Sequence, residues 1–290
     1  MANCLATPPF NAERCARALE AAQAVARRYG IRAHQPRVLH DANNIVVHLA
    51  PAPVVAKVCA ATAGARGWCK LAAELEIARH LVRADAPVVG PSADLPAGPH
   101  SEDGFAITFW RHHQHDSDVP VSAGIAGQTL AQVHLALDSY PGEVPSFLDR
   151  RLRYTARTLA DPAALSGLRA PELAFLRSEY SSLLSRLGEC RLGTRALHGD
   201  PHRGNLLVSR GEYLMIDFES VCTGPLEWDL SALPGGGAGV FAVDPQLLAL
   251  LRRLRSLCVA VWCWTRSVRA IELDRAARAH FDLLWERRVA

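Results

Sequence analysis

The sequence has 290 residues, enough for one large domain or two modest ones with a substantial core. Hydrophobic residues make up 49% and charged residues 21%, and the net charge of +3 gives no reason to expect a nucleic-acid or membrane-surface protein. The start, MANCLATPPF, lacks a basic residue before an apolar core, and no apolar run reaches the roughly 18 residues of a membrane span. We therefore expect a cytoplasmic protein without membrane or nucleic-acid partners.

The first third of the chain alternates between helical and extended patterns. Residues 11–29 place apolar side chains three and four apart and end at Gly30, which predicts an amphipathic helix. The runs VLH, NIVVHLA and VVAKVCA, separated by DANN and PAP, predict an antiparallel meander. Residues 66–83 return to helical spacing, and GFAITFW, residues 104–110, predicts a further strand.

From Val121 onward the pattern is mostly helical. Helices are predicted at residues 127–137, 147–160, 171–187, 245–271 and 273–288. LLVS and YLMIDF, joined by RGE, predict the one small hairpin of this half. The pattern indicates a small β-rich lobe up to about Thr108 and a larger helical lobe after the linker FWRHHQHD.

The eight cysteines form no CxxC pair. Several stand in apolar stretches such as VVAKVC and LCVAVWCW, as buried thiols do. We therefore expect reduced core cysteines rather than disulfides or a metal site.

The polar run HGDPHRGN, residues 198–205, stands directly before the hairpin. Asn205 precedes the first strand and Asp217 follows the second, so the hairpin can bring the two side chains together. Two hard oxygen ligands suit Mg²⁺, which leaves its other positions to water and phosphate. Asp200 would stand slightly outside the metal, free to accept a proton from an attacking hydroxyl.

Lys57 in the strand VVAKVC can complete a phosphoryl-transfer site. Such a site needs a positioned γ-phosphate, neutralised charge and an oriented nucleophile. Held by Glu74 of the following helix, Lys57 could grip the α- and β-phosphates. Glu76, two residues on and on a different helix face, is the competing partner.

Two simpler interpretations of the polar run compete with catalysis. Asp200 beside Pro201 could be a surface-turn residue. His198 and His202 could be zinc ligands, but that spacing serves a metal pair on a helix, and glycine and proline disfavour a helix here. The histidines at 112, 113 and 115 also need no metal, and their roles, like that of His202, stay open.

HGDPHRGN, IDFE and GPLEWDLS together closely resemble the aminoglycoside phosphotransferase-like family, small-molecule relatives of the protein kinases. The resemblance implies an α+β, bilobal protein-kinase-like fold with a small antiparallel-sheet N-lobe and a larger, mostly helical C-lobe. It implies a nucleotide-binding lobe over 1–108, a hinge over 109–116, and a helical lobe with catalytic loop and acceptor site over 117–290.

The resemblance also implies a role for individual residues. Asp200 resembles the catalytic aspartate, Asn205 and Asp217 the Mg²⁺ ligands, and Lys57 with Glu74 the phosphate-binding ion pair. His198 resembles the histidine that shapes the catalytic loop, and Asp229 the buried aspartate that braces it.

The nucleotide-covering loop departs from the kinase pattern, because HDANN replaces GxGxxG. Asn43 and Asn44 tolerate positive φ and could present backbone N–H groups to a phosphate. The resemblance places adenine against the hinge backbone at Phe109, Trp110 and Arg111, and it adds Ile216 to the nucleotide-binding residues. The donor is expected to be ATP, with GTP as the open alternative.

The acceptor is a hydroxyl of a small molecule, according to the resemblance. Between Gly211 and Pro245 the chain has six acidic residues and no lysine, arginine or histidine. Glu219, Glu227 and Asp244 are not assigned to metal or loop, so they could attract a cationic acceptor. We expect an aminoglycoside or a basic peptide antibiotic. The alternatives are a metabolite kinase of the choline or homoserine type, and a kinase-like nucleotide-binding protein without turnover.

Overall fold

The computed structural model describes residues 9–41, 44–60, 64–165, 167–237, 239–267 and 271–286. The chain divides into two compact units. Unit 1 comprises Met1–Val121, Thr129–Tyr140 and Gly204–Glu219, and unit 2 comprises Ser122–Gln128, Pro141–Arg203 and Ser220–Ala290. After Val121 the chain thus returns to unit 1 twice. The α+β class is confirmed by an antiparallel sheet in unit 1 and a mostly helical unit 2.

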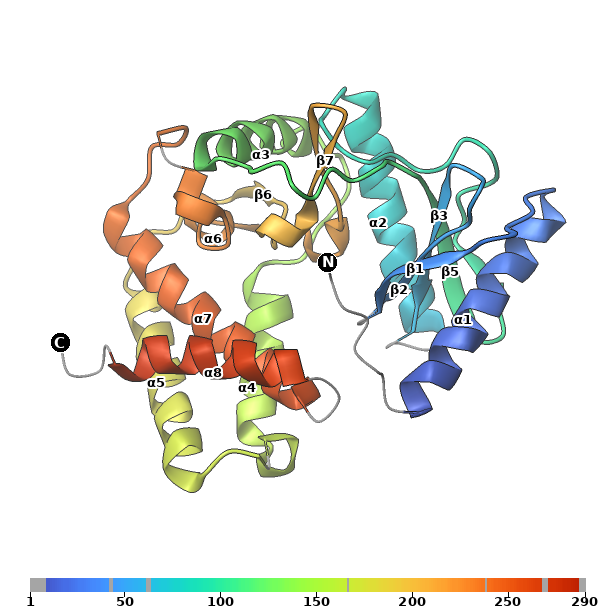
Figure 1. The fold of residues 1–290 in the computed structure, drawn as a ribbon. Coiled ribbons are helices and arrows are strands. Elements are labelled where there is room, and N and C mark those ends of the chain that lie inside the picture. Colours follow the sequence, from blue (N-terminus) through green and yellow to red (C-terminus); the bar gives the residue numbers. More distant parts are fainter. Residues whose placement is uncertain are drawn as a thin grey trace. The chain divides into compact units, whose positions relative to one another are not determined.

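Unit 1 contains a five-stranded antiparallel sheet in the order β1-β2-β3-β5-β4. Its strands are β1 (Arg37–Asp41), β2 (Asn44–His48), β3 (Val54–Cys59), β4 (His100–Glu102) and β5 (Phe105–Arg111). The helices α1 (Pro9–Arg28) and α2 (Ala65–Arg83) lie along the sheet (Figure 1).

Alternation along β3 decides which side chains reach which helix, because successive side chains of a strand point to opposite faces. Val54, Ala56 and Val58 are buried in one core with α1. Cys59 packs on the other face against Leu71 of α2. Lys57 shares the parity of Cys59 and therefore points toward α2.

The hairpin of β7 (Leu206–Ser209) and β8 (Glu212–Met215) also belongs to unit 1. The Met215 N–H donates to Pro87 O over 2.8 Å, and Val89 N–H donates to Met215 O over 3.1 Å. Asp116 N–H donates to Val208 O over 2.8 Å. These bonds fix both strands of the hairpin, and with them the residues at its open end.

Unit 2 is built around long helices whose apolar faces share one core. Its helices are α4 (Arg153–Ala160), α5 (Ala170–Gly188), α6 (Leu226–Leu230), α7 (Pro245–Ser267) and α8 (Ile271–Glu286). The strands β6 (Arg195–Leu197) and β9 (Cys222–Gly224) pair antiparallel beside the catalytic-loop sequence. Helix α3 (Ala123–Leu137) begins in unit 2 and ends in unit 1. Within the described ranges, no helix is both long and apolar enough to cross a membrane.

The remaining short helical elements are a π-helical turn, η1 (Leu148–Leu152), and the 3₁₀ turns η2 (Pro162–Leu165), η3 (Arg203–Asn205), η4 (Phe218–Ser220) and η5 (Pro234–Gly237). The predicted helix 147–160 is therefore a π turn followed by an α-helix. The sequence did not predict β4, β6, β9 or α6. Each has only three to five residues, too few to establish a period.

Candidate active site

The ammonium group of Lys57 lies among three carboxylates of unit 1. Lys57 Nζ is 2.7 Å from Glu74 Oε1, 2.9 Å from Asp217 Oδ1 and 2.9 Å from Glu219 Oε1. Of the two glutamates that the sequence left open, Glu74 makes the ion pair, while Glu76 is exposed. Helix α2 thus supplies a buried carboxylate at the point where β3 presents its lysine.

Glu219 ties further groups of unit 1 to this cluster. It accepts a hydrogen bond from Asn44 Nδ2 over 2.6 Å and pairs with Lys70 of α2. Sequence reasoning assigned Glu219 to the acceptor, whereas the structure gives it Lys57, Lys70 and Asn44 as partners. Its position two residues after Asp217, in the run IDFE, was the available signal.

Three carboxylates around one lysine leave a surplus of negative charge. Burial alone would lower the pKa of Lys57, but Asp217, Glu74 and Glu219 outweigh it and raise that pKa well above its ordinary value. Lys57 is therefore a permanent cation. Three carboxylate oxygens, one each from Glu74, Asp217 and Glu219, lie within 4.8 Å of one another. Such a group of hard oxygen donors suits a divalent cation.

The hairpin brings together the chain positions of the two predicted metal ligands. Leu206 pairs with Met215, and the Ile216 N–H donates to Asn205 O over 3.0 Å. Asp217 follows directly, in the left-handed region at φ 67°. Because non-glycine residues seldom adopt this conformation, it indicates a side chain held in a required direction. An amide and a carboxylate at this open end are the oxygen donors that Mg²⁺ or Ca²⁺ accepts.

The predicted nucleotide residues divide into three groups. Asn43 lies outside the described residues, and Asn44 is a buried residue of β2 bonded to Glu219. Phe109, Trp110 and Arg111 belong to β5, so the strand runs three residues into the expected hinge.

The backbone of β5 already has partners at two of those residues. Phe109 N–H donates to Ala97 O over 2.9 Å, and Arg111 N–H donates to Gly90 O over 3.0 Å. Both donors thus serve the chain itself, and the placement of adenine against residues 109–111 stays a prediction. Ile216 packs beside the apolar cluster of Trp110 and Leu75.

The predicted catalytic loop lies in unit 2, where Asp229 supports its backbone. The fully buried Asp229 accepts hydrogen bonds of 2.8 Å from the N–H groups of both His198 and Gly199. Gly199 has φ 87°, and a Cβ atom there would lie 1.9 Å from Ser220 O. The glycine is therefore required both by its conformation and by close approach.

The Asp200 carboxylate lies between two guanidinium groups. Arg151 Nη2 donates to Oδ2 over 2.7 Å, and Arg255 Nη1 donates to Oδ1 over 3.0 Å. Burial alone would raise the pKa of Asp200, but Arg151, Arg255 and His202 outweigh it and lower that pKa below its ordinary value. Asp200 is therefore an ionised carboxylate in the structure.

The two arginines are held very differently. Arg255, on α7, donates to Ser231 Oγ, Gly199 O and Trp228 O over 2.6, 3.2 and 2.7 Å, and its guanidinium carbon lies 4.0 Å from the Trp228 ring centroid. Arg151 comes from η1, and its side chain is 29% exposed compared with 6% for Arg255. Arg255 is thus part of the loop's support, whereas Arg151 reaches Asp200 from outside.

Sequence reasoning missed both arginines. Arg255 had a signal: it lies four residues after Leu251 and three before Cys258, on the buried face of α7, where an arginine needs an acidic partner. Arg151 stands in the run DRRLR, where no pattern separates it from its neighbours.

Of the remaining predicted acceptor residues, Glu227 belongs to α6 and Asp244 directly precedes α7. Asp244 Oδ1 accepts from the N–H groups of Gln246 and Leu247 over 2.8 and 3.2 Å, which makes it the helix cap. Glu227 Oε1 accepts from Asp244 N–H over 3.1 Å. Both carboxylates thus take part in local structure, and both belong to unit 2.

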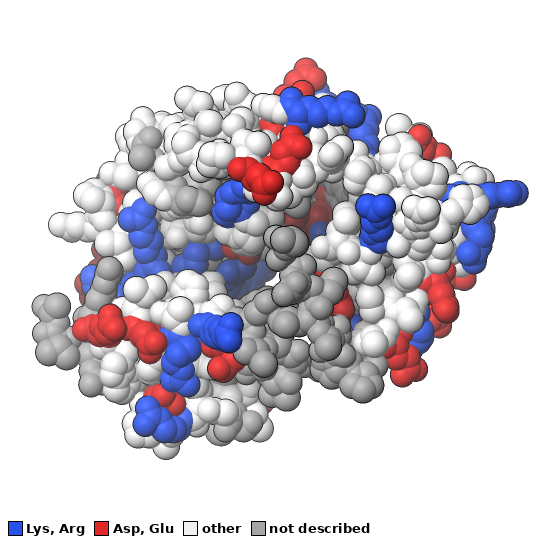
Figure 2. All heavy atoms as spheres, in the orientation of Figure 1, with Lys and Arg blue, Asp and Glu red and all other residues white. Residues whose placement is uncertain are grey.

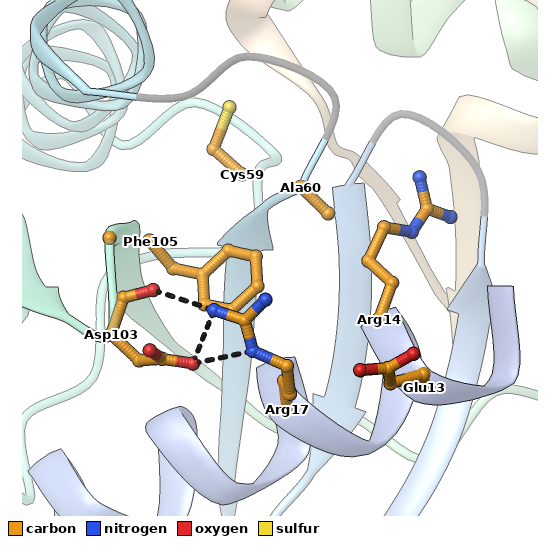
Figure 3. Close-up of a pocket in the computed structure, with 8 residues that line it drawn as sticks. Glu13, Arg14, Arg17, Cys59, Ala60, Asp103 and Phe105 are labelled. Carbon is orange, nitrogen blue, oxygen red and sulfur yellow. Dashed lines mark hydrogen bonds and ion pairs between the residues drawn. The ribbon is translucent and has the colours of Figure 1, made fainter. Parts of the chain in front are cut away.

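A small pocket of unit 1 lies apart from the Lys57 cluster, between α1, the end of β3 and the β4–β5 turn (Figure 3). Arg17 Nε donates to Asp103 Oδ2 over 2.9 Å, and Arg14 pairs with Asp41 over 2.8 Å. Both guanidinium groups that line the pocket are thus bound to carboxylates of the chain. None of the predicted site residues is among those that line it.

Comparison with known proteins shows the family to which the chain belongs. A family model described as the phosphotransferase enzyme family matches residues 69–266. The chain belongs to this family. Lys57 falls before the matched region, whereas Asp200, Asn205 and Asp217 fall inside it. No curated protein matches the sequence.

Solved structures of other phosphotransferases share the fold. The amicoumacin kinase hAmiN, in complex with AMP-PNP, Ca²⁺ and Ami, matches with a TM-score of 0.66 and 15% identity over 90% of this chain and 93% of its own. The GDP and kanamycin complex of APH(2")-IIia matches with a TM-score of 0.67 and 18% identity over 92% and 98%. The choline kinase LicA from Streptococcus pneumoniae matches with a TM-score of 0.64 and 14% identity over 92% of this chain and 98% of its own. The protein-kinase-like fold expected from the sequence is confirmed.

Proposed function

We propose that this phosphotransferase moves the γ-phosphate of ATP to a hydroxyl group of a small acceptor. The observation that carries the proposal is the Lys57 ammonium held between Glu74 and Asp217. A lysine fixed by a helix glutamate, beside a metal-binding aspartate, is the arrangement that kinases use to hold and neutralise phosphates. AMP-PNP and GDP in the complexes of related folds support a nucleotide donor.

In the proposed reaction, the acceptor oxygen forms a bond to the γ-phosphorus while the bond to the β–γ bridging oxygen breaks. The electron pair of that bond leaves with ADP. The hydroxyl proton passes to Asp200, whose lowered pKa keeps it ionised and able to accept the proton. Asp229 and Gly199 hold the loop so that the carboxylate has one fixed position.

Asn205 and Asp217 are the residues that would hold a divalent cation, with Mg²⁺ as the expected ion. When bound, this ion supplies charge neutralisation at the phosphate oxygens. Ca²⁺ accompanies the nucleotide analogue in the related amicoumacin kinase complex, which supports a divalent-ion requirement. Lys57 contributes a positive charge that belongs to the chain itself.

A cationic acceptor, such as an aminoglycoside or a basic peptide antibiotic, remains the acceptor predicted from the acidic segment. Glu227 and Asp244 are the members of that set that lie in unit 2 with Asp200. Kanamycin in the complex of one related fold supports this class, and choline kinase as another related fold supports a small metabolite.

The proposal is tested by measuring ADP release from ATP and from GTP with a panel of hydroxyl acceptors, together with mass spectrometry of the acceptor. The wild-type chain should form a phosphorylated acceptor, and Asp200→Asn should not. A nucleotide-binding protein without turnover would bind ATP in both variants and leave every acceptor unchanged. ADP release that is equal in the two variants would contradict the role of Asp200.

A further inference from the structure

The Asp200 carboxylate has two arginine partners in unit 2. Arg151 and Arg255 both bond to Asp200, and Asp229 is the nearby buried carboxylate. Figure 2 shows Lys and Arg atoms on the side of the molecule where Figure 1 draws α7. Two guanidinium groups thus contact one carboxylate, that of Asp200.

The two arginines bonded to Asp200 differ in how readily they can leave it. Arg255 would lose its bonds to Ser231, Gly199 and Trp228 together with its stacking on the indole ring. Among the described residues, Asp200 is the one side-chain hydrogen-bond partner of Arg151. Arg151 can therefore exchange one carboxylate for another without disturbing the support of the loop.

The place that Arg151 occupies matters for the proposed reaction. Arg151 Nη2 donates a hydrogen bond to Asp200 Oδ2, and Arg255 Nη1 donates one to Oδ1. Both carboxylate oxygens are thus engaged by cations, whereas a general base needs an oxygen within hydrogen-bond reach of the hydroxyl proton. An acceptor must either share Oδ2 with Arg151 or draw Arg151 away from it.

We propose that Arg151 is an acceptor-binding residue and that it recognises a carboxylate on the acceptor, near the hydroxyl that is phosphorylated. An incoming carboxylate replaces Asp200 as the partner of Arg151, since guanidinium binds carboxylate through short, charge-assisted bonds. The same exchange frees Oδ2 for the hydroxyl proton. This inference rests on the proposed function and narrows its acceptor class.

The inference concerns only the group next to the reacting hydroxyl. An acceptor can carry that carboxylate and also ammonium groups farther away, so a zwitterion satisfies both Arg151 and the acidic pair Glu227 and Asp244. A purely cationic acceptor would bring a like charge toward Arg151, which is unfavourable.

The test compares hydroxy acids with their primary amides, using homoserine, glycerate and lactate. Binding to the full chain loaded with a non-hydrolysable ATP analogue is measured by calorimetry, and turnover is measured with ATP. The variants are Arg151→Gln and Arg151→Lys. Arg153→Gln is the matched control, because Arg153 is 58% exposed and pairs with Asp149 on the same helical segment.

The wild type should bind at least one acid about 10- to 100-fold more tightly than its amide, the ratio expected for a charge-assisted hydrogen bond. Arg151→Gln should abolish this preference, Arg151→Lys should keep part of it, and Arg153→Gln should leave it unchanged. Equal binding of acid and amide in all three pairs would overturn the inference. A uniform loss of kcat in Arg151→Gln with unchanged KM would also overturn it, by placing Arg151 on the transferred phosphoryl group.

The binding measurement separates this inference from the proposed function. If the acids bind through Arg151 but no acceptor is ever phosphorylated, the proposed function fails while the acceptor site stands. If acceptors are phosphorylated without any preference for the acid, the proposed function stands and the acceptor site fails.

Discussion

The two charged clusters of the molecule are opposites in composition. In unit 1, the Lys57 cation is surrounded by the carboxylates of Glu74, Asp217 and Glu219. In unit 2, the Asp200 carboxylate is held between the cations of Arg151 and Arg255. The first cluster gathers carboxylates and suits a divalent cation, whereas the second places two guanidinium groups on one carboxylate and suits a further anion. In the proposed reaction their central residues have opposite tasks, because Lys57 keeps its charge and Asp200 takes up a proton.

The largest effect is expected from a substitution of Asp200, the central residue of the second cluster. Asp200→Asn removes the proton acceptor while keeping the shape of the side chain, so kcat should fall about 10²- to 10⁴-fold. Nucleotide affinity should stay near the wild-type value, because the Lys57 cluster is unchanged. Steady-state kinetics and nucleotide titration check the two statements, and a parallel loss of nucleotide binding would count against the division of roles.

Arg255→Met tests the fixed cation of the second cluster. It leaves the apolar stem over Trp228 but removes four hydrogen bonds, one of them to Asp200. Breaking one partner of a buried ion pair costs about 3–5 kcal/mol, so the urea midpoint of unfolding should drop clearly. Arg252→Met, at an exposed position of the same helix, is the control and should leave the midpoint in place.

Lys57→Met tests the central cation of the first cluster. Loss of one charge-assisted contact should weaken ATP binding about 10- to 100-fold. It also leaves three carboxylates without their shared cation, so activity should become more dependent on the divalent-ion concentration. Titrating Mg²⁺ at fixed ATP measures this, with Lys70→Met as the comparison that leaves Lys57 in place. Equal metal dependence in wild type and Lys57→Met would show that the lysine does not balance those carboxylates.

The smallest effect is expected in the pH profile. Because Arg151 helps to lower the pKa of Asp200, Arg151→Met should raise that pKa. Activity that needs the ionised carboxylate is lost as the pH falls through this pKa, so the acidic limb of kcat/KM should move to higher pH. The profile is measured with an amide acceptor, so that acceptor charge does not change. An unmoved limb would mean that Arg151 does not act on Asp200 during turnover.

The first cluster could be predicted from sequence more fully than the second. Lys57 alternates with apolar residues on a strand, Glu74 lies on the helix that follows, and Asn205 and Asp217 bracket a hairpin, so local patterns placed these residues on their elements. The preference for Glu74 over Glu76 came from the family resemblance. The partners of Glu219 were not predicted, because counting acidic residues along the chain does not reveal which of them already have a partner. The pairing of Glu219 with Lys70 depends on packing between α2 and the chain after β8.

The second cluster depends on contacts between residues far apart in sequence. Arg151, Asp200 and Arg255 are each separated by about fifty residues, and no local pattern connects them. The elements that bring these three residues together were also not predicted from the sequence. The π turn η1 looked like part of an ordinary helix, and α6, β6 and β9 are too short to give a period.

The π turn that carries Arg151 also has an evolutionary consequence. A π turn contains one residue more than the α turn that would replace it, and each residue of an α-helix turns the chain by about 100°. Deleting a single residue from Leu148–Leu152 would therefore swing the Arg151 side chain away from Asp200 while leaving the catalytic loop and α7 untouched. A relative with a different acceptor could arise by one codon deletion at this turn, and libraries that vary its length are a direct route to altered specificity.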